Sequence, residues 1–238
     1  MDLDYSSPGE VIVSTESYII EAIDEFPKEM TKTINTPAGN HIFKIDDACV
    51  NICKIDRIIF NRLVEKLLFL SKRARPDIQP TIAFLTTGVR NPDEEDWKNL
   101  RRVLSYLDVT INSVKLHLNA NNLNAVHLWV DASYNTRPYL KEQTWATISI
   151  RKGCFTSAFR KQKINATSST ISDLVGVHEA SPQLLWTKAF LWNQCFEVNK
   201  VTLYQGKMSA MLLKNNGRAS SSSRTKNIEI RYFSFRIG

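Results

Sequence analysis

Residues 125–133 read Ala-Val-His-Leu-Trp-Val-Asp-Ala-Ser, and the apolar side chains of Val126, Leu128 and Val130 recur at every second position. This period is typical of a β-strand with one buried face. Asp131 ends the apolar run, so we expect its carboxylate to leave the sheet from a rigid element. Such a carboxylate is either a surface or turn residue or a metal ligand. Metal-assisted phosphodiester cleavage needs several carboxylates together.

The sequence around this strand predicts a mixed sheet with helices packed on its faces over residues 111–238. Turn residues separate further segments of alternating polarity, and Pro182 is expected to open a second helix after a first one ends. The expected strands are 114–118, 125–133, 144–152, 155–161 and 198–205, and the expected helices are 168–180, 182–194, 209–214 and one that starts near 225.

Residues 1–110 are expected to be mostly helical. Apolar residues recur there at three- and four-residue steps, and acidic residues occupy the first turn of the helix that Asn91-Pro92 opens. The expected elements are a strand at 9–13, a helix at 14–26, an irregular connector at 27–55 and helices at 56–72, 76–89 and 92–107. We therefore expect an α+β protein with one domain in residues 1–110 and another in residues 111–238.

The 238-residue chain carries a formal charge of +7, but its two parts differ. Residues 1–110 sum to −4 and residues 111–238 to +11. A basic half of this kind either faces a polyanion, most often nucleic acid, or reflects an arbitrary surface composition. No run of about 18 apolar residues predicts a membrane span, and the acidic N-terminal stretch is unlike a secretory signal. We expect a cytoplasmic or nuclear protein, and the sequence leaves its oligomeric state open.

Four segments, in this order, resemble one protein family: 127–134, 160–176, 204–213 and 217–233. Residues 127–134 read His-Leu-Trp-Val-Asp-Ala-Ser-Tyr, the second segment ends in Ser-Ser-Thr-Ile-Ser-Asp-Leu-Val-Gly, and residues 204–213 read Tyr-Gln-Gly-Lys-Met-Ser-Ala-Met-Leu-Leu. They resemble the ribonuclease H domain of copia-type retrotransposon polyproteins. Residues 67–89 are similar to the segment between palm and ribonuclease H in the same reverse transcriptases, and residues 1–26 to the end of the palm. The resemblance implies a helical, thumb-like segment followed by a ribonuclease H-like mixed sheet with flanking helices.

The resemblance also implies a ribonuclease H site that is damaged here. Asp131 stands at the first acid of the family pattern, and Asp173 replaces a glutamate at the second. The third acid is missing, since Gly206 stands in its place and Lys207 follows. Glu229 keeps an acid near the end of the chain, without the histidine that the family has beside it. On this resemblance Mg²⁺ or Mn²⁺ would be held by Asp131 and Asp173, and only weakly.

The polymerase site of the family uses palm aspartates, and the matching region would precede Met1. The nearest paired carboxylates, Asp46-Asp47, fall in the connector. Without palm ligands the metals that activate a primer hydroxyl have no place to bind, so we expect no DNA synthesis.

The sequence therefore predicts a degenerate, catalytically inactive remnant of a copia-type reverse transcriptase. Four basic residues border the hairpin strands and either contact nucleic-acid phosphates or form a solvated rim: Arg151, Lys152, Lys161 and Lys163. Two alternatives stay open. One is a working metal-dependent ribonuclease for RNA–DNA hybrids that uses Asp131, Asp173 and Glu229. The other is a noncatalytic nucleic-acid binding module.

Four tryptophans are expected to be core residues: Trp129, Trp145, Trp186 and Trp192.

Overall fold

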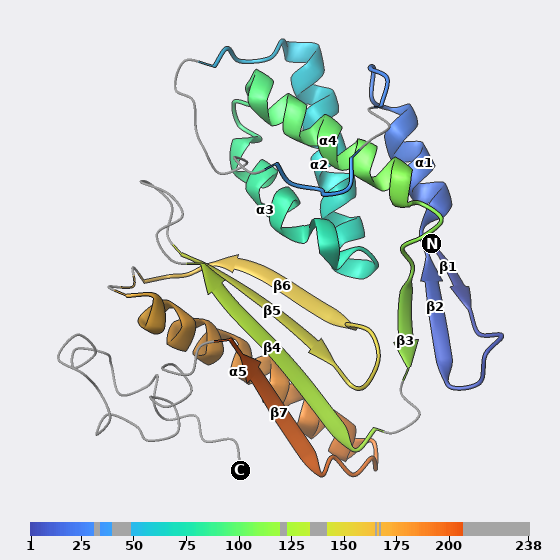
Figure 1. Cartoon of the computed structure of the whole chain (residues 1–238), viewed down its shortest axis with the longest axis vertical. Coiled ribbons are helices and arrows are strands. Elements are labelled where there is room, and N and C mark those ends of the chain that lie inside the picture. The colour runs from blue at the N-terminus through green and yellow to red at the C-terminus, as the bar shows by residue number, and fades with distance from the viewer. Residues whose placement is uncertain are drawn as a thin grey trace. The chain divides into compact units, whose positions relative to one another are not determined.

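The described residues form helices and two separate sheets, an α+β arrangement as expected (Figure 1). The computed structural model describes residues 1–30, 34–39, 49–119, 123–133, 142–164, 166 and 168–206. The chain divides into two compact units, Met1–Leu118 and Asn119–Gly238.

The first unit is built around four helices. They are α1 (Glu16–Asp24), α2 (Lys54–Arg73), α3 (Gln79–Gly88) and α4 (Glu94–Thr110), with a short 3₁₀ turn, η1 (Pro76–Ile78), before α3. A reciprocal capping box starts α4, because the Asp93 side chain accepts from the Asp96 backbone while the Asp96 side chain accepts from the Asp93 backbone. The apolar faces meet in one core that includes Ile19, Phe60, Leu63, Leu67, Ile82, Leu100, Leu104 and Leu107.

A small sheet completes the first unit. Its strands β1 (Asp2–Asp4), β2 (Glu10–Ser14) and β3 (Leu116–Asn119) lie in that order. The sequence did not predict β1. It also placed residues 114–118 in the sheet of the second domain, which is wrong, because β3 belongs to the sheet of β1 and β2. Alternating polarity predicts a strand but does not identify its partner.

The second unit contains a four-stranded mixed sheet. Its strands are β4 (Ala125–Ser133), β5 (Gln143–Ser149), β6 (Thr156–Lys161) and β7 (Lys200–Gln205), in the spatial order β6-β5-β4-β7. β4, β5 and β6 run antiparallel to their neighbours, whereas β7 lies parallel to β4. The chain reaches β7 through the helix α5 (Ser169–Asn193), as a parallel connection requires.

One continuous helix replaces the two helices predicted at 168–180 and 182–194. Pro182 lies inside α5, although a proline in a helix interior removes a hydrogen bond and costs about 3 kcal/mol. Residues on both sides of Pro182 pack on the same sheet, including Val177, Leu184 and Leu191, so tertiary packing offsets this cost. The prediction of two helices was wrong because packing of the apolar residues on both sides of Pro182 stabilises one continuous helix by more than the proline destabilises it.

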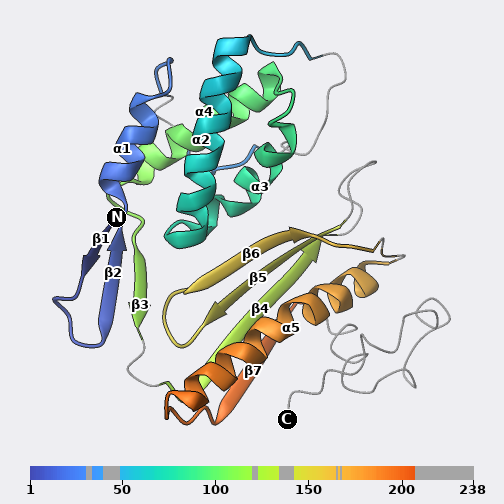
Figure 2. The ribbon, with the colours of Figure 1, turned by 180° about the vertical axis from the view of Figure 1, so that it is seen from behind.

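Helix α5 lies along one face of the β4–β7 sheet (Figure 2). Its buried side chains meet Val126, Leu128 and Val130 of β4, which all point to that face. Because side chains alternate along a strand, the positions of His127, Trp129 and Asp131 belong to the opposite face. The two faces of this sheet therefore have different environments, and the site below is built on that difference.

Several predicted features lie outside the described residues. They are Asp46, Asp47, Lys207, Glu229 and the helices expected at 209–214 and from 225. Among the described residues, no helix combines the length and the hydrophobicity needed to cross a bilayer.

Candidate functional site

Asp131 lies near the end of β4, and Gly206 directly follows the last residue of β7, the strand paired with it. The parallel register joins Trp129 to Tyr204 and Val130 to Gln205, so one further step along the chain leads to Asp131 in β4 and to Gly206 after β7. Both line an open hollow of about 780 Å³ on the sheet surface. The structure thus brings to one hollow the two positions that the resemblance assigns to the first acid and to the lost third acid, and their role as a former metal site stays a prediction.

The space at Gly206 is empty enough for a side chain. Apart from its chain neighbours, no atom of the described residues would lie within 4 Å of a Cβ atom added there. Crowding by the described residues therefore does not account for the lack of a carboxylate at this position. Asp131 itself is exposed, and its Oδ1 accepts a hydrogen bond from the backbone N–H of Ala132 at 3.0 Å. Its carboxylate is accessible to a ligand in the hollow.

Asp173 lies in a different layer from Asp131. It sits near the start of α5 and is only 3% exposed. One turn further, a Cβ atom on Gly176 would lie 3.1 Å from Thr144 and 3.3 Å from Val130, so this part of α5 packs closely on the sheet. Val130 and Asp131 point to opposite faces of β4. The helix therefore approaches the face that Asp131 does not occupy.

The donor set in the described residues does not fit a two-metal site. No group of three or more His, Cys, Asp or Glu side chains suited to a metal ion occurs among them. Two metal ions about 3.5–4 Å apart require carboxylates shared between them. Gly206 supplies no donor, and Asp173 lies within the helix layer. The assignment of Asp131 and Asp173 as joint metal ligands stays a prediction.

The hollow is lined by three aromatic side chains, and the sequence assigned two of them, Trp129 and Trp145, to the core. Trp129 and Trp145 are each 40% exposed, and Tyr204 is 43% exposed. Trp186 and Trp192 on α5 are more exposed still. The prediction that the four tryptophans are core residues is therefore wrong. Alternation places a tryptophan on one face of a strand, but it does not say which face another layer covers.

The four basic residues selected from the sequence are all exposed. Lys161 ends β6, where it pairs with Gln143 of β5, and Lys163 follows shortly after. Arg151 and Lys152 lie in the turn between β5 and β6, where the Lys152 backbone bridges to Asn119. Exposed basic side chains at strand ends can contact phosphates as solvated charges. Their contact with nucleic acid stays a prediction.

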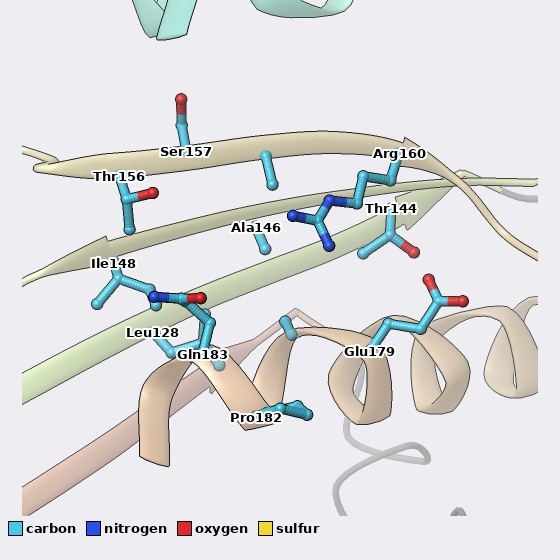
Figure 3. A pocket seen from close by; sticks show the side chains of 12 residues that line it. Leu128, Thr144, Ala146, Ile148, Thr156, Ser157, Arg160, Glu179, Pro182 and Gln183 are labelled. Carbon is cyan, nitrogen blue, oxygen red and sulfur yellow. The ribbon is translucent and has the colours of Figure 1, made fainter. Parts of the chain in front are cut away.

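A second cavity, which the sequence did not predict, lies between β6 and α5. It has a volume of about 250 Å³ and an apolar floor that includes Leu128 and Ile148. Arg160 from β6 and Glu179 from α5 both reach into it (Figure 3). Burial raises the pKa of the Glu179 carboxyl, against the opposing effects of the Lys163 backbone N–H and the Lys163 and Arg160 charges. The one feature of the sequence that could have indicated this cavity is the small residues of β5 and β6, because small side chains leave space beside the helix.

Comparison with known proteins gives two informative similarities. The chain is 22% identical over 224 residues to the retrovirus-related Pol polyprotein from transposon TNT 1-94 of Nicotiana tabacum, which covers 92% of this chain and 17% of that protein. It is 26% identical over 153 residues to a transposon Ty5-1 protein of Saccharomyces cerevisiae, which covers 64% of this chain and 49% of that protein. These similarities support a retrotransposon origin. The chain spans about a sixth and about half of the lengths of these two relatives.

No protein-family profile matches the chain, and no solved structure matches it. The two relatives are therefore the basis for its origin, while the chemistry of the site rests on the geometry of Asp131, Gly206 and their surroundings.

Proposed function

We propose that the chain is a remnant of a copia-type reverse transcriptase whose second unit is a ribonuclease H-like domain without hydrolytic activity. Three antiparallel strands are followed by a helix and by a strand parallel to the first, which together form a mixed sheet with a flanking helix, and this arrangement supports the fold assignment. The similarity to two transposon proteins supports the origin. On this proposal the protein retains weak, sequence-independent binding to nucleic acid.

The observation that carries the loss of hydrolysis is Gly206 beside Asp131. In a two-metal mechanism, carboxylates on neighbouring elements hold both ions and stabilise the attacking and leaving oxygens. At this pair of strand ends only one of the two positions carries a carboxylate. Lys207, the next residue in the sequence, adds a positive charge that competes with a cation. Any remaining hydrolysis would need Mg²⁺ or Mn²⁺ held without that ligand.

The retained binding is proposed from charge. Residues 111–238 carry a net charge of +11, and the basic residues at the ends of β5 and β6 are exposed. Phosphate contacts of this kind release counterions and carry no sequence information. Binding to hybrid or duplex is therefore expected to be weak and to fall steeply as salt increases.

A salt titration of the full chain with a labelled RNA–DNA hybrid tests this proposal. We expect log K to fall linearly with log salt concentration, and we expect Lys161→Glu with Lys163→Glu to reduce both affinity and slope. Lys72→Glu with Lys98→Glu is the matched control, because both are exposed lysines of the first unit, on α2 and α4, and the change in charge is the same. Affinity that ignores salt, or that the control variant reduces equally, would contradict the binding part of the proposal.

A further inference from the structure

The face of the β4–β7 sheet opposite α5 carries a cluster of aromatic rings. We call it the aromatic face and define it by His127, Trp129, Trp145 and Tyr204. Register places them together, because Trp129 pairs with Tyr204 of β7 while Asp131, two residues on, pairs with Trp145 of β5. All four occupy the alternate positions that point away from the α5 layer.

The rings of His127, Trp129 and Tyr204 contact one another, and the tryptophans and Tyr204 of the aromatic face are still accessible. Trp129 and Tyr204 stack with centroids 5.0 Å apart and planes within 10° of parallel. His127 lies 5.7 Å from Trp129 and 5.8 Å from Tyr204. About two fifths of each tryptophan and of Tyr204 stays exposed, and both tryptophans line the hollow beside Asp131. Exposed apolar surface gathered in this way marks an interaction site more often than an ordinary surface.

The charges around the aromatic face favour a polyanion. Lys200 and Lys161 are exposed, and they occupy the same face at opposite ends of the aromatic cluster. Among the described positions of that face, Asp131 is the only acidic residue. A ligand with flat apolar groups and a negatively charged backbone matches rings flanked by lysines. Single-stranded nucleic acid has both features, since every base has a stacking face and the phosphates remain available to the lysines.

We propose that the aromatic face binds single-stranded nucleic acid by stacking unpaired bases on Trp129 and Trp145. This inference rests on the proposed nucleic-acid function and extends it, because it assigns unpaired bases, and not only the phosphates of a hybrid, as the ligand. Stacking of this kind tolerates any base sequence. Lys161 and Lys200 supply the salt-dependent part of the same contact.

Fluorescence anisotropy of the full chain with a labelled oligothymidylate provides the test. Loss of one stacking ring is expected to weaken binding by about 5- to 160-fold, so Trp129→Ala and Trp145→Ala should each show such a loss. Trp129→Phe should keep most of the affinity, because an aromatic ring remains. Trp186→Ala is the matched control, since Trp186 is an exposed tryptophan on α5, where it stacks on Phe190. The salt slope should be unchanged in all four variants, because none removes a cation.

Parallel titrations with a fully paired hybrid separate this inference from the proposed function. If the hybrid binds with the expected salt dependence but the alanine variants bind oligothymidylate as the parent does, base stacking is overturned and the proposed function stands. If neither nucleic acid binds, both fail. Circular dichroism melting checks that each variant is folded. Sedimentation measures the self-association of each variant. If Trp129→Ala or Trp145→Ala abolishes self-association and leaves oligothymidylate binding intact, the aromatic face contacts a second copy of the protein, and the proposal is overturned.

Discussion

Replacing Gly206 with aspartate probes the pairing of the two strand ends directly. Neighbouring strands lie about 4.8 Å apart, so the new carboxylate would stand about 5 Å from that of Asp131. Two unit charges at this separation repel by about 0.8 kcal/mol in water and about 3 kcal/mol at an effective dielectric constant of 20. Asp131 is exposed, so we expect a value near the lower limit, about 1 kcal/mol. This corresponds to a fall in melting temperature of about 4 °C for a domain of this size.

Divalent cations should reverse this loss. Mg²⁺ binds through one or two carboxylates and keeps several waters, which suits an open hollow. A cation present at ten times its Kd stabilises the folded state by about 1.4 kcal/mol, because it binds that state alone. The assay is thermal melting of Gly206→Asp with and without Mg²⁺ or Mn²⁺. Gly206→Asn is the control, because it has nearly the same shape without the charge.

The comparison of the melting temperatures of Gly206→Asp and Gly206→Asn tests whether the two strand ends are neighbours. We expect a cation-dependent rise in melting temperature for Gly206→Asp only, and a larger one when Lys207→Asn is added, because that change removes a neighbouring positive charge. If Gly206→Asp folds and melts like Gly206→Asn at every cation concentration, the two strand ends are not neighbours and the assignment of this hollow as the former metal site fails.

Three further predictions concern stability and its pH dependence. Gly176→Ala should lower the free energy of unfolding, measured with denaturant, by about 1 kcal/mol. The new methyl group crowds the buried Thr144, and this cost outweighs a gain in helix propensity of about 1 kcal/mol. A more stable variant would show that the sheet moves to accommodate the methyl group. Asp93→Ala removes the cap of α4 and should cost about 1 kcal/mol, and an unchanged urea midpoint would argue against the capping box. Burial raises the pKa of Glu179 in the folded state above its usual value of 4.5, so its contribution to stability falls as pH rises from 4.5 through the folded pKa. Glu179→Gln should therefore be stabilising relative to the parent at pH 7 and less so at pH 4, and a difference independent of pH would refute this.

The sequence predicted the elements whose signals are local. Helix α4 has acidic residues in its first turn and a regular apolar stripe, and both lie where expected. Strand β4 was predicted from the alternation around Asp131. The partners of the strands could not be predicted in the same way, which is why β3 was assigned to the wrong sheet. Pro182 misled the prediction of α5, because the packing that carries the helix past it is visible only in three dimensions.

The candidate site was predictable only in part. Asp131 and Gly206 could be selected from the sequence by resemblance, but their proximity depends on the parallel pairing of β4 and β7. The aromatic face was missed for a related reason. Alternation shows that Trp129 and Val130 point to opposite sides, and only the position of α5 shows that Val130 is the covered one.

The most direct test of the central claim is a cleavage assay on an end-labelled RNA–DNA hybrid with the full chain, in Mg²⁺ and separately in Mn²⁺. The protein and its Asp131→Ala variant are prepared in parallel, so that a contaminating nuclease appears equally in both. Because Gly206 leaves the site without a second carboxylate beside Asp131, we expect no cleavage above that of the variant. Cleavage by the parent protein that Asp131→Ala abolishes would contradict the account and identify a working ribonuclease.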